Sequence, residues 1–237
     1  MTAVQDKIVL ITGGAKGIGA QMTTTFREAG ARVYTMDLTA PADFIGDLAK
    51  QADLEAFANF VLEKHSGIDV LIHNAAPLMK GISSASYEDF TYALQVGVAA
   101  PFYLTKLFKD HLNPGASILM LSSSRDRMSQ PETETYTAAK GGIAALTHAL
   151  AVSLAGKARV NSISPGWIDT AGEEQTLTDH MQHPAGRIGR PEDIANLALF
   201  LSSEQAGFIT GENITVDGGM TRLMIYHDDQ GWTYQKD

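Results

Sequence analysis

Short apolar runs alternate with longer stretches of helical periodicity along the chain. Runs of apolar and β-branched residues, each of a length that suits one buried strand, occupy positions 7–11, 31–36, 68–73, 117–121, 158–163 and 213–216. Helical patterns cover positions 17–29, 53–64, 87–111, 133–153 and 191–201. Strands that alternate with helices in this order predict a single α/β domain built on a doubly wound parallel sheet, with helices on both faces.

Two segments do not follow this alternation. Residues 169–189 show no strong periodicity, and we interpret them as an excursion over a pocket. Residues 221–237 continue past the last predicted strand, so we divide the chain into one domain, residues 1–220, and a C-terminal tail. The tail carries Met224, Tyr226, Trp232 and Tyr234, which make it too apolar to stay fully wet. It packs either on a neighbouring subunit, whose pocket it would close, or on its own surface.

The composition narrows the classes of partner. The 237 residues carry a formal net charge of −9 and include no cysteine. The acidic balance argues against a nucleic-acid or anionic-membrane surface, since both need a basic footprint, and favours a small-molecule partner. Without cysteine, disulfides, zinc–thiolate sites and thiol catalysis are excluded. The apolar run at 8–11 is too short for a signal sequence or a membrane span, so we expect a soluble cytoplasmic protein.

A glycine-rich turn joins the first predicted strand to the first helix. Gly13, Gly17 and Gly19 do not follow the G-x-G-x-x-G spacing, but they let the backbone approach a pyrophosphate over a helix N-terminus in the same way. Asp37 ends the second strand, at the place of the acid that hydrogen-bonds the adenosine ribose of NAD and repels the extra phosphate of NADP. Lys16 is a cation near the same end of the ligand and argues for NADP. We predict NAD, with NADP as the alternative.

Tyr136 and Lys140 lie four residues apart in the helix predicted at 133–153. Positions i and i+4 share one face of a helix, so the phenol and the ammonium project into the same space. A nearby cation favours the phenolate and lowers the pKa of a phenol from its usual value of about 10. The pair therefore predicts a side chain that exchanges a proton with an alcohol or a carbonyl.

With the glycine turn, Asp37 and the tyrosine–lysine pair in place, positions 7–219 resemble the short-chain dehydrogenase/reductase family. The resemblance implies a Rossmann-like fold and an NAD(P)-dependent oxidoreductase. Ser123 precedes Tyr136 by 13 positions, as the catalytic serine of the family does. The other matching motifs are Asp47-Leu48, Asn74-Ala75-Ala76, Asn161–Thr170, Arg190–Ala195 and Gly211–Gly219.

The resemblance also implies the residues of the site. Ser123, Tyr136 and Lys140 would be catalytic. The cofactor would contact Gly13, Lys16, Gly17, Ile18, Gly19, Asp37, Asp47, Leu48, Asn74, Ala75, Ala76, Tyr136, Lys140, Pro165, Gly166, Ile168 and Thr170. Tyr136 would take the hydroxyl proton of a secondary alcohol while hydride passes to the nicotinamide, or donate it to a ketone in the reverse direction. Ser123 would hydrogen-bond the substrate oxygen, and Lys140 would lower the pKa of the phenol and hold the nicotinamide ribose.

Several positions leave alternatives open. Gly97 stands where the family has an asparagine that helps to hold a water on the proton path to the lysine. Glycine weakens a helix by about 1 kcal/mol relative to alanine, so we expect a kink or a water there. Either water or another polar group replaces the asparagine and catalysis survives, or activity is low. Ala76 adds a methyl group near the cofactor where the family has glycine. Ser122 and Ser124 compete with Ser123, but on a strand they face the other way.

The substrate pocket draws on segments of mixed chemistry. Its walls are expected from positions 77–82, 125–130 and 168–187, which do not identify a substrate. Arg125 at the pocket mouth would suit an acidic substrate, although we favour a plain surface charge cluster with Asp126 and Arg127. His180 and His183 have no carboxylate or cysteine close by in the sequence, so we predict solvated side chains and no metal site.

Three functions fit these features. The first is an NAD-dependent oxidoreductase acting on a secondary alcohol or its ketone, and the second is an NADP-dependent carbonyl reductase. The third is a cofactor-binding protein with low or no turnover, suggested by the missing asparagine. The family implies a homotetramer, with a dimer as the alternative. The helices predicted at 87–111 and 133–153 carry apolar residues on more than one face, which is consistent with burial between subunits.

Overall fold

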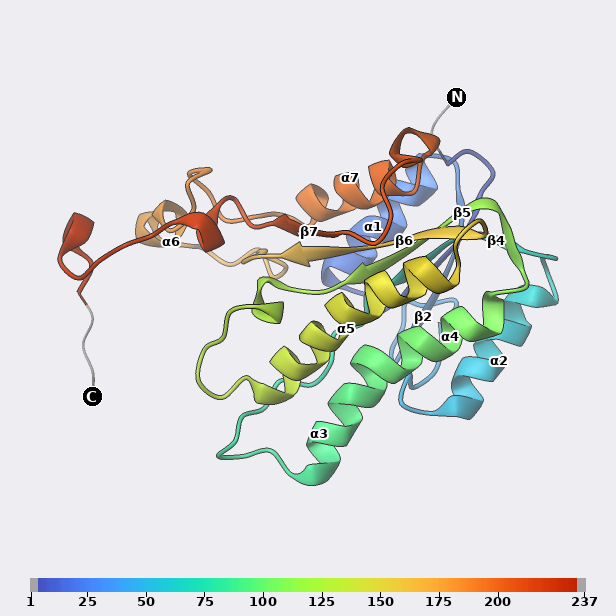
Figure 1. The fold of residues 1–237 in the computed structure, drawn as a ribbon, viewed down its shortest axis with the longest axis horizontal. Helices are drawn as coiled ribbons and strands as arrows, with labels where there is room; N and C mark the ends of the chain where they lie inside the picture. Colours follow the sequence, from blue (N-terminus) through green and yellow to red (C-terminus); the bar gives the residue numbers. More distant parts are fainter. Residues whose placement is uncertain (1–3, 234–237) are drawn as a thin grey trace.

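A seven-stranded sheet forms the centre of the computed structural model, which describes residues 4–233 (Figure 1). The strands are β1 (Ile8–Thr12), β2 (Arg32–Asp37), β3 (Phe44–Ile45), β4 (Ile68–His73), β5 (Leu112–Leu121), β6 (Ala158–Pro165) and β7 (Asn213–Val216). They lie in the order β3-β2-β1-β4-β5-β6-β7, and every neighbouring pair is parallel. The predicted parallel sheet is therefore confirmed.

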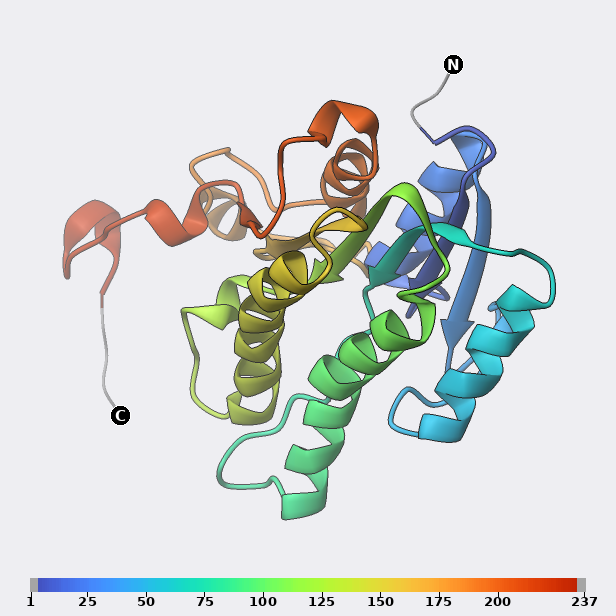
Figure 2. The same ribbon diagram turned by 45° about the vertical axis from the view of Figure 1, so that its right-hand side comes forward.

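Helices cover the two faces of the sheet as separate layers (Figure 2). One layer contains α1 (Gly17–Glu28) and α7 (Pro191–Leu201), which contact each other. The other contains α2 (Gln51–Leu62), α3 (Tyr87–Leu94), α4 (Ala100–Phe108) and α5 (Glu134–Ser153). Alternate residues of β1 serve opposite layers, because successive side chains of a strand point to opposite faces. Leu10 packs in the core with Phe57 and Phe108, whereas Val9 packs in the core with Met22 and Phe26.

The carboxyl ends of β1 and β4 lie at the middle of the sheet. β1 pairs with β2 on one side and with β4 on the other, so that Thr12 stands opposite both Met36 and His73. The connections that leave β1 and β4 run to opposite halves of the sheet, and an open α/β sheet forms its ligand crevice at such a point. The glycine turn after Thr12, Asn74 after β4 and Ser122 after β5 all begin at this edge.

The helix predicted at 87–111 is interrupted, and it ends early, at Phe108. A π-helical turn, Gln95–Ala99, separates α3 from α4. Gly97 lies in this turn, where a Cβ atom would stand 2.7 Å from the Cβ of Ala139 in α5. The kink expected at Gly97 is thus present as a π turn. A π turn contains an extra residue and shifts the phase of the helix. The apolar residues on more than one face of this segment can therefore be explained without a neighbouring subunit.

Three smaller elements differ from the sequence-based prediction. β5 begins at Leu112, five residues before the predicted start, although its pairing with β4 shifts register near that end. The two-residue strand β3 was not predicted, because two residues carry no periodicity. A short helix, α6 (Leu177–Met181), lies within the excursion at 169–189, and its first turn is capped by the Thr176 hydroxyl.

The described part of the C-terminal tail extends away from the sheet in both views (Figures 1 and 2). Met224 is 74% exposed and Tyr226 is 65% exposed, so this part of the tail does not bury its apolar side chains on its own domain. Tyr234 lies outside the described residues. Over residues 4–233, the helices are all too short or too polar to cross a membrane.

Candidate active site

A cavity of about 620 Å³ opens at the carboxyl edge of the sheet. This volume lies in the range of about 300–1,000 Å³ that is usual for small-molecule sites. Every site residue that the sequence predicted lines this one cavity. They are Gly13, Lys16, Gly17, Ile18, Gly19, Asp37, Asp47, Leu48, Asn74, Ala75, Ala76, Ser123, Tyr136, Lys140, Pro165, Gly166, Ile168 and Thr170.

The glycine turn is held in a tight, preformed shape. Gly13 has a φ of +67° and Gly17 a φ of +55°, a region that favours glycine. At Gly19, a Cβ atom would lie 1.9 Å from the carbonyl oxygen of Gly13, so only glycine fits there. Asn74 braces the turn from β4, since its Nδ2 donates to the carbonyl oxygens of Thr12 (3.1 Å) and Gly13 (2.8 Å). The turn leads directly into α1, whose N-terminus faces the cavity.

Asp37 and Asp47 are two carboxylates that line the cavity. The Asp37 carboxylate accepts a hydrogen bond from the Ala15 amide (3.0 Å), which ties it to the glycine turn, and another from the Thr39 amide (3.4 Å) in the loop after β2. Asp47 Oδ1 accepts from the Ala49 amide (2.9 Å) and the Tyr92 hydroxyl (3.2 Å). A glycine turn at a helix N-terminus beside a half-buried carboxylate fits a dinucleotide, with its pyrophosphate on the turn and its ribose at Asp37.

Ser123, Tyr136 and Lys140 converge where β5 meets α5. Lys140 is 2% exposed, and its Nζ lies 5.4 Å from the centre of the Tyr136 ring. The same Nζ donates to the carbonyl oxygen of Leu121 at 2.6 Å. The Ser122 hydroxyl donates instead to the Lys140 carbonyl oxygen (2.9 Å), which leaves Ser123 as the strand-end serine beside the phenol.

Burial is the main influence on the pKa values of Tyr136 and Lys140. Burial raises the pKa of Tyr136, while a hydrogen bond with Ser123 and the positive charge of Arg125 act in the opposite direction. Burial also lowers the pKa of the Lys140 amine to about 7, so the amine is only partly charged near neutral pH. The expectation that Lys140 lowers the pKa of the phenol is therefore not met in this structure, where the net shift of the phenol is upward.

Some cavity residues escaped sequence reasoning. Leu38, Thr39, Gly46, Tyr92, Val96 and Leu121 line the cavity without having been predicted. Leu38 and Thr39 directly follow Asp37, so their place next to the predicted ribose contact was a usable signal. Tyr92 and Val96 lie four apart on α3 and the π turn, but nothing in their chemistry distinguished them from core residues.

The predicted pocket walls are only partly present around this cavity. Pro77 and Leu78 line it, as do Ile168 and Thr170. None of positions 125–130 lines it, although the Arg125 amide donates to the hydroxyl of Ser123, which does, at 3.2 Å.

His183 is buried, which corrects the prediction of a solvated side chain. It is 2% exposed, contacts the Trp167 ring, and places Nδ1 3.2 Å from the carbonyl oxygen of Asp179. The excursion folds back on the domain at this point, since the Ala185 amide donates to the carbonyl oxygen of Gly218. Over residues 4–233, no three histidine, aspartate or glutamate side chains group as metal ligands.

Comparison with known proteins relates the chain to oxidoreductases. A family model described as enoyl-(acyl carrier protein) reductase matches residues 13–221. An uncharacterized oxidoreductase of Thermotoga maritima is 37% identical over 255 residues, which cover 95% of this chain and 100% of that protein. The 7alpha-hydroxysteroid dehydrogenase of Escherichia coli K12 is 33% identical over 241 residues, covering 91% of this chain and 94% of that protein.

A solved structure gives the same answer at the level of the fold. The apo SCOR enzyme from Clostridium thermocellum is 43% identical, with a TM-score of 0.91 over 98% of this chain and 99% of that one. Since the family match spans most of the sequence and these relatives are matched nearly end to end, the chain belongs to the short-chain dehydrogenase/reductase family of oxidoreductases, whose members use nicotinamide cofactors.

Proposed function

We propose that the protein is an NAD-dependent oxidoreductase that interconverts a secondary alcohol and a ketone. The observation that carries the proposal is the convergence of Ser123, Tyr136 and Lys140 on one cavity with a glycine turn and Asp37. The Escherichia coli relative supports chemistry at a CH–OH group, because it is named as a hydroxysteroid dehydrogenase. The chemistry that a nicotinamide dinucleotide supplies when bound is hydride transfer.

Tyr136, Ser123 and Lys140 have separate roles in the proposed reaction. The Tyr136 hydroxyl lies among buried groups and exchanges the proton of the substrate oxygen. Ser123 donates a hydrogen bond to that oxygen, and a donor aimed at developing negative charge is typically worth about 10²–10³ in rate. The buried Lys140 amine, anchored at Leu121, holds the nicotinamide ribose and feeds the proton path.

Asp37 favours NAD over NADP. Its carboxylate lies beside the glycine turn, where the added phosphate of NADP would meet a like charge. Lys16 is exposed at the cavity edge, as expected for a solvated loop lysine.

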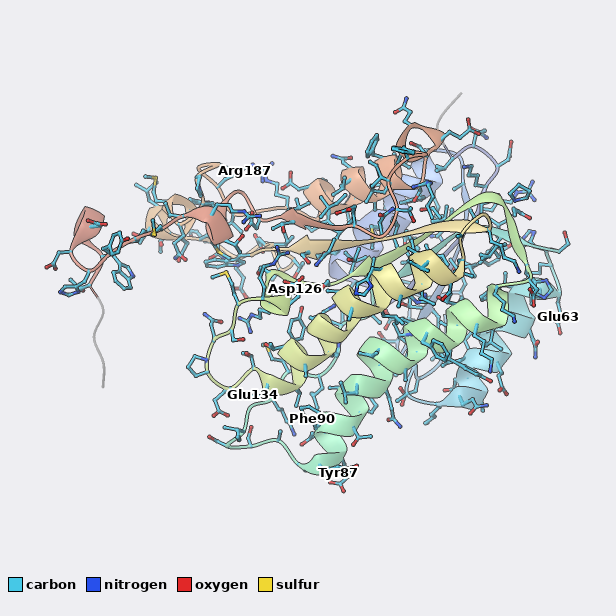
Figure 3. All side chains as sticks on the ribbon, viewed as in Figure 1. Glu63, Tyr87, Phe90, Asp126, Glu134 and Arg187 are labelled. Carbon is cyan, nitrogen blue, oxygen red and sulfur yellow. The ribbon has the colours of Figure 1, made fainter. Side chains whose placement is uncertain are left out.

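Titrations with NADH and NADPH test this preference. We expect tighter NADH binding by wild type, and NADPH binding that tightens about tenfold or more in Asp37→Asn, which keeps an oxygen acceptor for the Ala15 amide but removes the charge. Glu63→Gln is the control for net charge, since Glu63 follows the C-terminal end of α2, away from the cavity (Figure 3). Tighter binding of NADPH than NADH by wild type would refute the role given to Asp37.

One observation favours a second candidate, a cofactor-binding protein with low turnover. Gly97 provides no side chain at the place of the usual asparagine, and the nearby Lys140 amine bonds to a backbone carbonyl. Nicotinamide absorbance with a panel of secondary alcohols and ketones separates the two candidates. Turnover of any of these substrates supports the oxidoreductase, whereas stabilisation by NADH without turnover supports the binding protein.

We also propose that the protein is a homo-oligomer, a tetramer in the form the family implies. The exposed apolar side chains of the tail, Met224 and Tyr226 among them, support packing on a neighbouring subunit. Light scattering on the full chain and on a variant that ends at residue 220 tests this proposal. A monomeric full chain would refute it, and a smaller assembly for the shortened chain would assign the contact to the tail.

A further inference from the structure

Arg125 lies two residues after Ser123, which lines the cavity. It lies on a short 3-10 turn, Ser124–Asp126, that follows β5. Its guanidinium reaches the loop after β4, where Nη1 lies 3.0 Å from the sulfur of Met79, and it also donates to the side-chain oxygen of Gln130. Leu78, the neighbour of Met79, lines the cavity together with Ser123. The guanidinium therefore lies near the part of the cavity that Leu78, Ser123 and Tyr136 line.

The charge of Arg125 is not paired with a carboxylate anywhere in residues 4–233. Its side-chain partners, a thioether and an amide, are both neutral. The adjacent acid, Asp126, is labelled in Figure 3. Its side chain is 3% exposed and forms an ion pair with Arg127 at 2.9 Å. Asp126 also accepts hydrogen bonds from Ser164 and Asn213.

The predicted surface charge cluster is thus two separate features. Asp126 and Arg127 form a structural pair that ties the loop to β6 and β7. Arg125 remains as a cation with neutral neighbours, next to a reaction centre in an acidic protein. Its charge acts at that centre, since it is one of the two influences that lower the pKa of Tyr136 against the effect of burial.

The surroundings of Arg125 suit a small organic acid. Met79, whose sulfur contacts the guanidinium, is 52% exposed, so an apolar side chain lies beside the cation. A guanidinium pairs with a carboxylate through two parallel hydrogen bonds, which neutral acceptors such as a thioether or an amide cannot match. A ligand carboxylate would therefore displace the contacts with Met79 and Gln130.

We propose that Arg125 binds the carboxylate of the substrate, so that the enzyme acts on a hydroxy acid and its oxo acid. This inference rests on the proposed oxidoreductase function and specifies its substrate class. In the oxidative direction the C–H and O–H bonds of the carbinol break, hydride passes to NAD⁺ and the proton to the Tyr136 phenolate. The carboxylate is unchanged and serves only to orient the carbinol carbon.

Matched acids and esters test the proposal. Values of kcat/KM are measured for 2-, 3- and 4-hydroxy acids and for their methyl esters, which differ from the acids by the charge. We expect wild type to prefer at least one acid over its ester by about 10- to 100-fold, the usual effect of a hydrogen bond to a charged group. In Arg125→Gln this preference is lost through a higher KM for the acid, and NADH binding is unchanged. Any change in kcat should be the same for acid and ester, because the lost charge also acts on the Tyr136 phenol.

Two further variants control the interpretation. Arg125→Lys keeps the charge but cannot form the two parallel hydrogen bonds of a guanidinium, so it should show only part of the wild-type preference for the acid. Lys106→Gln removes the same unit of charge from an exposed position on α4 and should retain the full preference. Equal use of acids and esters by wild type, or a preference that persists in Arg125→Gln, overturns the proposal.

A binding measurement keeps this proposal separate from the proposed function. Butanoate and butanamide are titrated calorimetrically into the complex with NADH. We expect butanoate to bind wild type and to bind Arg125→Gln about tenfold more weakly or worse, with no such difference for butanamide. Failure of butanoate to bind wild type in preference to butanamide overturns the role of Arg125. Binding of butanoate through Arg125, without turnover of any hydroxy acid or of the panel of secondary alcohols and ketones, upholds that role and refutes the oxidoreductase function.

Discussion

Replacing Gly97 with alanine tests how the π turn packs on α5, the helix that carries Tyr136 and Lys140. The new methyl carbon would stand 2.7 Å from the Cβ of Ala139, about 1 Å inside the optimal separation of about 3.5–4.0 Å between carbon atoms. It could not move far the other way, because two carbons of Pro77 would lie at 3.4 Å. Overpacking of this kind costs about 1–3 kcal/mol, and the better helix propensity of alanine returns about 1 kcal/mol.

A double-mutant cycle isolates the contact from the propensity. Ala139→Gly removes the opposing methyl group, so the double variant Gly97→Ala/Ala139→Gly should recover the overpacking term. We expect a favourable coupling of about 1–3 kcal/mol in the free energy of unfolding, measured by urea denaturation. Gly141→Ala in α5 is the control, since its new Cβ atom meets nothing nearer than 3.9 Å and should stabilise by up to about 1 kcal/mol. Additive effects, with a coupling below about 0.5 kcal/mol, would refute the reasoning.

The cycle also bears on catalysis. Ala139 precedes Lys140, so a displacement of α5 moves the amine and should lower kcat in Gly97→Ala, with recovery in the double variant. Gly97→Asn brings a larger side chain into the same space and should destabilise the protein more than alanine does. We therefore expect the family's asparagine to lower activity in this chain unless Ala139 is reduced as well.

Three further predictions concern single side chains. Tyr136→Phe should lower kcat/KM by about 10²–10⁴ with NADH binding unchanged, and a variant as active as wild type would contradict the role of the phenol. In wild type the rate of oxidation should rise with pH above neutrality, because burial raises the pKa of the Tyr136 phenol. Asn74→Ala removes two hydrogen bonds to the glycine turn and should weaken NADH binding about tenfold by calorimetry, so an unchanged Kd would contradict the bracing role. Burial lowers the pKa of His73 from 6.5 to about 3. Between these two pH values the imidazole gains a proton in the unfolded chain but not in the folded protein, so the free energy of unfolding should fall as the pH drops. His73→Gln should flatten this slope in urea midpoints, and equal slopes would assign it to other groups.

Much of the fold followed from periodicity, and much of the site from the order of motifs along the chain. The glycine turn, Asn74, Ser123 and Gly166 are far apart in sequence, but each follows a strand, and parallel strands bring their carboxyl ends to one edge. The π turn could not be predicted with the same means. It needs only one extra residue in a helical turn, which leaves composition and the local apolar pattern almost unchanged.

Burial was the other property that local sequence did not reveal. The i and i+4 spacing placed Tyr136 and Lys140 together, but the direction of the pKa shifts depends on how much of the domain covers them. His183 illustrates the same limit. It lies in an excursion without periodicity, so nothing in the sequence indicated which side chains of that segment would turn inward.

The hydrogen bond between Asp37 and the Ala15 amide would link the proposed choice of cofactor to the shape of the glycine turn. Any exchange that simply deletes the carboxylate, in order to admit a phosphorylated ribose, would also strip that amide of its acceptor. The glycine turn would then lose this support in the free protein, and ligand binding would have to order it. A variant that binds NADPH more tightly therefore needs an exchange such as Asp37→Asn, in which a neutral oxygen keeps the hydrogen bond to Ala15 while the repulsion is removed.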